Sequence, residues 1–167
     1  ERDGMEFVLV SRPYPDDGGE QWTIHTEGRI SFIEKKASGI DISELKNRCC
    51  AHVEISKDKK LSNFTFGPRW DNIMQIHSGE NDDMLLTLQL PEPYMPDLSA
   101  YLLHPALLDN AVNGAAQYMK DSGKGGMYLP LSYKSIRVYG KLPGCFFSYV
   151  KKIPDSRENT ETRSYDI

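Results

Sequence analysis

Tyr101-Leu-Leu-His-Pro-Ala-Leu-Leu-Asp-Asn-Ala-Val-Asn-Gly-Ala-Ala-Gln-Tyr118 combines a helix-start signal, an apolar stripe and a single carboxylate. Pro105 suits the first position of a helix, because its missing N–H would be unpaired there and its fixed φ is already helical. His104 then lies at or near the N-cap. One buried face is predicted from the apolar residues that follow at helical spacing, namely Leu108, Val112, Ala115 and Met119. We therefore predict a central helix near residues 104–121, wrapped by sheet.

Asp109 and Asn113 lie four residues apart, so they share a neighbouring face of this helix. An acidic residue in a first helical turn commonly does no more than stabilise the positive end of the helix, by about 0.3–1 kcal/mol. Asp109 is flanked by apolar residues, however, and we expect it at the rim of a packed groove. Such surroundings disfavour the ionised carboxylate and suit a general acid, whereas the helix dipole acts in the opposite direction. The sequence leaves open which effect is larger.

Three further stretches accompany His104-Pro-Ala-Leu-Leu-Asp109 and carry a family resemblance. They are Trp22-Thr-Ile-His25-Thr-Glu-Gly28, Phe66-Gly67-Pro68-Arg69-Trp70 and Leu129-Pro130-Leu131-Ser132-Tyr133. In this order they resemble the Trp-x-x-His-x-x-Gly strand, the Tyr-Gly-Pro-x-Phe turn and the Leu-Pro-Phe strand of polyketide synthase dehydratase domains. The helix start resembles the second catalytic motif of the same domains. The four matches are in register over most of the chain.

The resemblance implies an α+β hotdog fold, part of a double hotdog, in which an antiparallel sheet wraps around the central helix. Residues 1–33 would end the first hotdog, residues 34–60 would link the two, and residues 61–167 would form the second. The chain would then be a fragment, cut at both ends. Strands are predicted at residues 5–12, 21–32, 49–55, 71–79, 84–90, 128–139 and 145–152, with the first two forming a hairpin and Pro91–Pro96 forming a loop.

The chemistry implied by the resemblance is loss of water from a β-hydroxyacyl thioester carried on the phosphopantetheine arm of an acyl carrier protein. Asp109 would be the acid, and Asn113 would hold it by a hydrogen bond. The resemblance also implies a set of substrate-binding residues: Phe66, Gly67, Pro68, His104, Pro105, Leu108 and Pro130. It implies neither a metal nor a redox cofactor. The expected partners are the carrier protein, other polyketide synthase domains and the missing first-hotdog half.

Three departures from the family pattern leave the specific reaction open. The family's base is a histidine in a His-x-x-x-Gly-x-x-x-x-Pro motif, which none of the four histidines (His25, His52, His77 and His104) matches. We therefore expect the base in the missing half. Asn113 replaces the usual Gln or His, which shortens its reach by roughly 1.5 Å. Phe66 replaces a tyrosine and so lacks a hydroxyl that can hydrogen-bond near the reacting oxygen.

Because of these departures, several functions other than dehydration remain open. Relatives with altered motifs include enoyl isomerases and pyran-forming cyclases on the same fold, and also catalytically silent structural domains. A free-standing thioester hydrolase of the hotdog type is a further alternative. The sequence does not fix the chain length or the stereochemistry of the substrate.

Composition narrows the remaining classes of function. A mean hydropathy of −0.53 with 39% hydrophobic residues is typical of a soluble globular protein, and we expect a cytoplasmic one. The net charge of −4 offers no basic field for nucleic acid, and no apolar run is long enough to span a bilayer. Cys49, Cys50 and His52 lack a second cluster that would complete a metal site, so none is expected.

Overall fold

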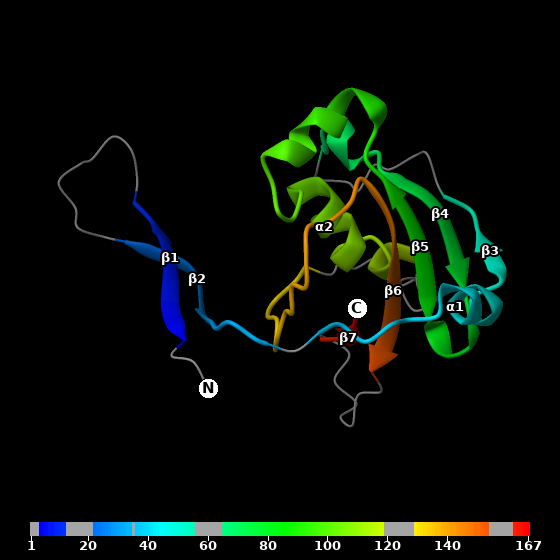
Figure 1. The fold of residues 1–167 in the computed structure, drawn as a ribbon, viewed down its shortest axis with the longest axis horizontal. Helices are drawn as coiled ribbons and strands as arrows, with labels where there is room; N and C mark the ends of the chain where they lie inside the picture. Colours follow the sequence, from blue (N-terminus) through cyan, green and yellow to red (C-terminus); the bar gives the residue numbers. More distant parts are fainter. Residues whose placement is uncertain (1–3, 13–21, 35, 56–64, 119–128, 154–161) are drawn as a thin grey trace. The chain divides into compact units, whose positions relative to one another are not determined.

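The computed structural model describes residues 4–12, 22–34, 36–55, 65–118, 129–153 and 162–167 (Figure 1). The chain divides into two units, Glu1–Ser38 and Gly39–Ile167. Each unit has its own antiparallel sheet, of two and of five strands. Whether these units correspond to the ends of two hotdogs stays a prediction.

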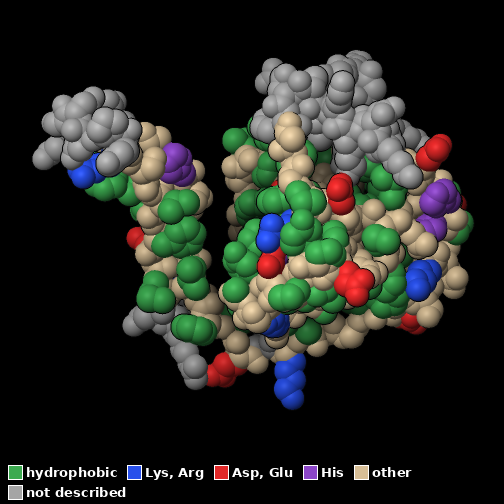
Figure 2. Space-filling view, turned by 90° about the horizontal axis from the view of Figure 1, so that it is seen from above, with side chains coloured by type: hydrophobic (Ala, Val, Ile, Leu, Met, Phe, Trp, Pro, Cys, Tyr) green, Lys and Arg blue, Asp and Glu red, His purple; other side chains and the backbone are tan. Residues whose placement is uncertain are grey.

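The first unit is the predicted hairpin. Strand β1 (Met5–Ser11) pairs antiparallel with β2 (Thr23–Ile30), and the register shifts between Leu9 and Val10. We predicted the even-numbered apolar residues of the second strand to be half-buried, but each is more than half exposed: Trp22, Ile24, Ile30 and Phe32. Figure 2 shows hydrophobic side chains at the surface along this hairpin. A two-stranded ribbon has no second layer of its own to cover them.

The second unit is built on a five-stranded sheet of order β3-β4-β5-β6-β7. Its strands are β3 (Ala51–Val53), β4 (Ile73–Ser78), β5 (Met84–Gln89), β6 (Cys145–Ile153) and β7 (Ser164–Asp166). The helices are α1 (Ile42–Arg48) and α2 (Pro105–Asn113). Short 3-10 turns complete the unit, namely η1 (Pro68–Trp70), η2 (Glu80–Asp82), η3 (Glu92–Ser99) and η4 (Ala116–Tyr118).

The two helices cover opposite faces of this sheet, as Figure 1 shows. On β5 the side chains alternate, so Leu86 and Leu88 pack in the cluster that contains Leu107 of α2. Leu85 lies on the other face and packs with Leu45 of α1. The core therefore lies mainly between β5, its neighbouring strands and α2. This is the α+β hotdog arrangement that the motifs implied, and the predicted apolar face of β5 is confirmed.

The central helix is shorter and rotated relative to the prediction. It ends at Asn113, and residues 119–121 of the predicted span lie outside the described residues. Its buried residues are Ala106, Leu107 and Ala111, whereas the predicted positions Leu108 and Val112 are only half-buried. Ala115 is buried as expected, and Met119 lies outside the described residues. The buried face is displaced by one residue from the predicted one, and one residue corresponds to a rotation of about 100° around the helix axis. Leu108 and Val112, which we expected in the core, therefore lie beside Asp109.

Asp109 is the fifth residue of α2, and the first turn of this helix contains no acidic residue. The prediction that Asp109 lies in the first turn was therefore wrong. The favourable contact of an acid with the helix dipole falls off within the first turn. Stabilisation of the helix end consequently does not explain this carboxylate.

Three other segments differ from their predicted structure. Residues 129–139 were predicted to be strand but form none, and they are exposed, while position 128 lies outside the described residues. Pro91–Pro96 was predicted to be loop, and most of it belongs to η3. The expected linker at 34–60 contains both α1 and β3. The last strand, β7, carried no signal that we recognised.

Candidate active site

The Asp109 carboxylate accepts a hydrogen bond on each of its oxygens. The Asn113 amide Nδ2 donates to Oδ1 at 2.7 Å, and the Trp70 indole Nε1 donates to Oδ2 at 2.7 Å. All three side chains are half-buried. The carboxylate is therefore held in one orientation at the edge of the core, where part of it remains accessible.

Asn113 reaches Asp109 because α2 places residues four apart on the same face. The helix begins at Pro105, with His104 at the N-cap, as the sequence predicted. The shorter asparagine makes the expected hydrogen bond in full, so its lost methylene does not prevent the contact.

The turn η1 brings Trp70 to this helix. Gly67 caps it and Pro68 occupies its first position. Two asparagines then tie the turn to α2. The Asn110 amide donates to the Trp70 carbonyl at 2.9 Å, and the fully buried Asn72 donates to the Ala106 carbonyl at 3.0 Å. Buried polar groups must be paired, so these bonds fix the turn against the helix.

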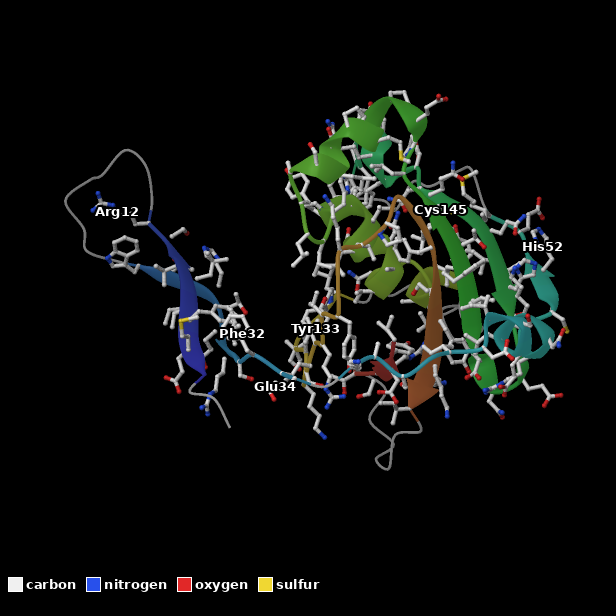
Figure 3. The ribbon with its side chains drawn as sticks, in the orientation of Figure 1. Arg12, Phe32, Glu34, His52, Tyr133 and Cys145 are labelled. Carbon is white, nitrogen blue, oxygen red and sulfur yellow. The ribbon has the colours of Figure 1, made fainter. Side chains whose placement is uncertain are left out.

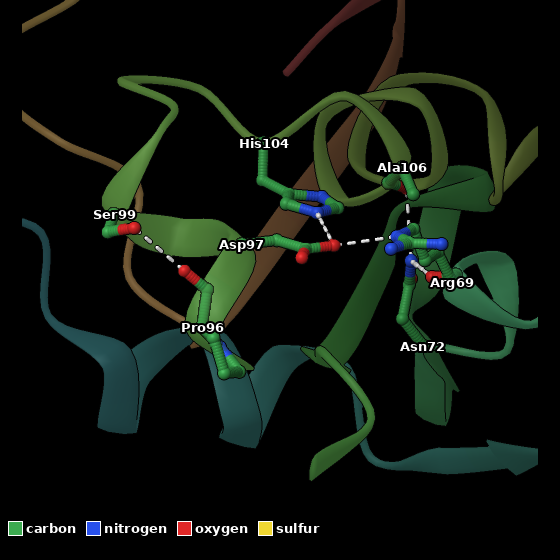
Figure 4. Close-up of polar contacts among 7 residues, drawn as sticks. All are labelled: Arg69, Asn72, Pro96, Asp97, Ser99, His104 and Ala106. Atoms are coloured by element: carbon green, nitrogen blue, oxygen red, sulfur yellow. Dashed lines mark hydrogen bonds and ion pairs between the residues drawn. The ribbon is translucent and has the colours of Figure 1, made fainter. Parts of the chain in front are cut away.

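A second polar cluster lies at the start of α2 (Figure 4). The Arg69 Nε donates to Asp97 Oδ2 at 2.6 Å, and this hydrogen bond lowers the pKa of Asp97 and raises that of Arg69. His104 Nε2 lies 3.8 Å from the same oxygen. The His104 side chain is 2% exposed, and its Nδ1 has no hydrogen-bond partner within the described structure. This burial does not favour the predicted contact of His104 with substrate, which stays a prediction.

Tyr133, which Figure 3 labels, belongs to the exposed segment 129–139. It lies within electrostatic reach of Asp109. Burial of its hydroxyl raises the pKa of Tyr133, and the negative charge of Asp109 raises it further. Its side chain is 53% exposed. The segment that resembles the Leu-Pro-Phe strand therefore does approach the carboxylate, although it is not a strand.

The other residues predicted to bind substrate differ in their exposure and in their contacts with this site. The Phe66 ring centroid is 6.1 Å from that of Trp70, and Phe66 is 48% exposed. Pro105 is exposed at the helix start, Leu108 is half-buried, and Pro130 is exposed. The structure thus groups Phe66 with Trp70 and Asp109. Whether these residues touch substrate stays a prediction.

The remaining histidines belong to other places in the fold. His25 shares a hydrogen bond of 2.6 Å with Ser11 within the hairpin. His52 and His77 lie opposite each other on β3 and β4, with ring centroids 5.6 Å apart. We found no base motif around any of them in the sequence, and their contacts are those of structural residues.

Sequence reasoning missed Trp70, Asn72 and Asn110. Trp70 carried a signal, since it stands where the family pattern has phenylalanine and adds an N–H donor. The two asparagines carried none, because their partners are backbone carbonyls from distant segments, 34 and 40 residues apart along the chain.

Neither a metal cluster nor a membrane helix is found in the described ranges. No three His, Cys, Asp or Glu side chains gather there closely enough to hold a metal ion. Cys49 is buried, and this burial raises the pKa of its thiol, while Cys50 is exposed. Within the same ranges no helix combines the length and the apolar character needed to cross a membrane.

Residues 45–167 match the family model described as the polyketide synthase dehydratase N-terminal domain. Polyketide synthase PksM of Bacillus subtilis (strain 168) is 24% identical over 159 residues, which cover 89% of this chain and 4% of that protein. The description of the family model refers to an N-terminal domain, whereas the motifs predicted a second hotdog for residues 61–167. Which half of the fold the chain represents stays a prediction.

Solved dehydratase domains share the fold. The dehydratase domain from the CurK module of the curacin polyketide synthase is 25% identical, with a TM-score of 0.68 over 93% of this chain and 54% of that one. A trans-AT polyketide synthase dehydratase domain from Brevibacillus brevis is 19% identical, with a TM-score of 0.80 over 98% of this chain and 57% of that one. The chain thus spans about half of these domains and a few per cent of the curated synthase.

Proposed function

This chain belongs to the polyketide synthase dehydratase family, and we propose that it forms part of a domain that eliminates water from a β-hydroxyacyl thioester. The observation that carries the proposal is the Asp109 carboxyl group, held on both oxygens by Trp70 and Asn113 at a half-buried position. Fixed, partly desolvated carboxyl groups serve well as proton donors to leaving groups. The substrate is presented by an acyl carrier protein on its phosphopantetheine arm.

At the substrate carbons, the proposed reaction breaks a C–H and a C–O bond and forms the second bond of a C=C pair. A base removes the α-proton, which the thioester acidifies. The electron pair of that C–H bond forms the C=C bond, and the C–O bond to the β-hydroxyl breaks. Asp109 gives a proton to the departing oxygen, so water leaves and an enoyl thioester remains. A proton then passes from the base to Asp109 before the next turnover. We assign the base to a histidine in the other half of the domain.

These steps are proton transfers, so the proposed chemistry calls for no redox cofactor and no metal. Two groups that differ in protonation at one pH are sufficient, as in other acid–base pairs. The relatives are large polyketide synthases, so the neighbouring domains of such a synthase are the proposed source of the substrate. Its chain length and stereochemistry are not part of the proposal.

The test uses the complete domain, with its other half present, and a β-hydroxyacyl carrier protein. Intact-mass spectrometry of the carrier should show the loss of one water. The Asp109→Asn variant should lower the rate by about 10²–10⁴-fold, the range of a general acid. Asp166→Asn on the exposed strand β7 is the matched control and should react as the wild type does. Equal rates for wild type and Asp109→Asn would overturn the proposal.

Enoyl isomerisation is the second candidate, and the identity of Phe66 favours it. Phe66 lies beside Trp70 but offers no hydroxyl near the leaving oxygen. Moving a double bond needs only proton transfer between carbons, so this loss affects isomerisation less than dehydration. An isomerase would leave the β-hydroxyacyl carrier unchanged in mass and would incorporate deuterium from D₂O at the γ-carbon of an enoyl carrier. A carrier unchanged in both experiments would indicate a structural domain.

A further inference from the structure

We propose that Trp70 is a positioning residue for Asp109, and that its indole N–H supplies a second donor to this carboxyl group. This inference rests on the function proposed above. The carrying observation is the 2.7 Å hydrogen bond from Trp70 Nε1 to Asp109 Oδ2. Trp70 matches the phenylalanine of the family's turn and therefore adds a donor that the pattern lacks.

A second donor changes what the carboxyl group is free to do. The terminal torsion of an aspartate is broad and roughly two-fold, so one hydrogen bond leaves the plane of the carboxyl group poorly defined. Asn113 holds Oδ1, and Trp70 holds Oδ2 from a different segment of the chain. Donors on both oxygens fix that plane. Because a misplacement on the order of 1 Å can cost about 10²-fold in rate, fixing the plane matters for proton delivery.

The backbone of Trp70 is tied to α2 by a chain of side-chain hydrogen bonds. The Asn110 amide donates to the Trp70 carbonyl at 2.9 Å and to Asn72 Oδ1 at 3.0 Å. Asn72 donates in turn to the Ala106 carbonyl of α2 at 3.0 Å. Trp70 therefore keeps its place relative to the helix that carries Asp109. A residue that acts through another group needs this kind of support.

Phe66 and Arg69, which lie near Trp70 in the same turn, make contacts of their own. Phe66 packs beside the indole, with ring centroids 6.1 Å apart and ring planes at 35°. It offers an apolar contact and no hydroxyl. On the other side, Arg69 is held by Asp97 at 2.6 Å, which anchors the residue before Trp70. Trp70 is thus flanked by an apolar ring on one side and by an anchored residue on the other.

The kinetic test compares Trp70→Phe with the matched control Trp22→Phe in the complete domain. Trp70→Phe keeps an aromatic ring beside Phe66 and removes the N–H donor together with the second ring of the indole. We expect kcat to fall by about 10- to 100-fold with KM little changed, because a misoriented acid affects the reaction and not the binding. Trp22 belongs to the unit Glu1–Ser38, whereas Asp109 belongs to the unit Gly39–Ile167, so the Trp22 variant should keep the wild-type kcat. Equal kcat values for Trp70→Phe and wild type would overturn the inference.

A spectroscopic test separates this inference from the proposed function. The chain contains two tryptophans, so its ¹H–¹⁵N spectrum should show two indole signals. The Trp70 signal should lie downfield, because its proton is shared with a carboxylate, and should move upfield in Asp109→Ala while the Trp22 signal stays in place. A Trp70 signal unmoved by Asp109→Ala would refute the contact. If Asp109→Asn keeps full turnover, the proposed function fails even where this shift is seen.

Discussion

At the residue scale, the site is one carboxyl group between two nitrogen donors. Asn113 lies one turn further along the same helix, whereas Trp70 comes from a turn 39 residues earlier. The sequence allowed the first contact to be predicted, since spacing by four residues places side chains on one helix face. The second contact depends on how two distant segments pack, and a helical pattern holds no information about that.

Removing the nearer donor should weaken catalysis without abolishing it. Asn113→Ala loses one hydrogen bond to a charged group, worth about 1.5–3 kcal/mol, so we expect kcat of the complete domain to fall by roughly 10- to 100-fold. Steady-state kinetics would measure this change. Asn113→Gln can restore the bond with a longer side chain and should recover most of the rate. An alanine variant as fast as wild type would show that Asn113 does not act on Asp109.

Tyr149 provides a test of stability against pH. Burial, and then its hydrogen bond to the buried Asp83, raises the pKa of Tyr149 to about 12. Because this folded-state pKa lies above the value of about 10 in an unfolded chain, the stabilisation is complete below pH 10 and is lost as the pH rises toward 12. The Tyr149→Phe variant lacks this contribution at every pH.

We therefore expect Tyr149→Phe to lower the free energy of unfolding by about 1–3 kcal/mol near neutral pH, since Asp83 loses a hydrogen-bond donor. The difference from wild type should narrow above about pH 10. Denaturant unfolding of both proteins at several pH values would measure it. A difference that stays constant between pH 7 and 12 would contradict the assignment.

At the scale of elements, the position of α2 on the sheet depends on a glycine. A Cβ added to Gly114 would meet the Ile73 Cδ1 atom of β4 at 2.9 Å and also the Asn110 carbonyl oxygen. Gly114→Ala should therefore push the helix from the sheet and destabilise the fold by about 1–3 kcal/mol. Thermal unfolding should show the change, and Gly140→Ala, where the space is open, should be neutral. Equal destabilisation by both variants would argue against this close contact.

Helix α1 should respond to its N-cap. Asp41 accepts hydrogen bonds from the backbone N–H groups of Ser43 and Glu44, and Leu45 anchors the helix on the outer face of the sheet. Asp41→Ala should lower the free energy of unfolding by about 1 kcal/mol, whereas Asp41→Asn should keep the cap. Chemical denaturation of the two variants would decide, and equal losses would exclude the capping role.

The elements that could be predicted are those whose pattern is local. Alternation in Met84–Leu90 predicted β5, and the Pro105 start predicted α2. The N-cap of α1 also has a local sequence signal, since Asp41 precedes Glu44 by three residues. We did not predict this helix, because we interpreted the lysines of the region as a solvated surface. The strand at residues 128–139 was predicted from its resemblance to the Leu-Pro-Phe strand of the family. Segment 129–139 has no strand pairing among the described residues, and strand structure depends on pairing.

At the scale of the whole molecule, exposed apolar surface is the most informative feature. Hydrophobic side chains more than half exposed occur on the hairpin, such as Trp22 and Ile24, and in segment 129–139, such as Leu131 and Ile136. Large exposed apolar patches are rare on monomeric proteins. We therefore predict that the chain by itself associates with further copies.

Sedimentation velocity over a range of concentrations would test this self-association. Particles should grow in mass as the concentration rises, and ionic strength should have little effect, because the contacts are apolar. The control is the complete domain, whose other half is expected to cover these surfaces. A chain that sediments as one monomeric species at every concentration would contradict the prediction.

Four short motifs were enough to predict the fold and the family, because their order and spacing along most of the chain match one family. They did not predict the second donor to Asp109 or the burial of His104, since both depend on side-chain packing between η1, η3 and α2. A family pattern describes which residues recur. It does not describe which contact a departure such as Trp70 makes with Asp109.

The most direct test of Asp109 as an acid held by two donors is the single-turnover rate of water loss from a β-hydroxyacyl carrier protein. The complete domain would be compared as wild type, Trp70→Phe and Asp109→Asn. We predict that the rates fall in that order, with Trp70→Phe between the other two and Asp109→Asn slowest by about 10²–10⁴-fold. Water loss by Asp109→Asn at the wild-type rate would contradict the central claim that this carboxyl group carries the reaction.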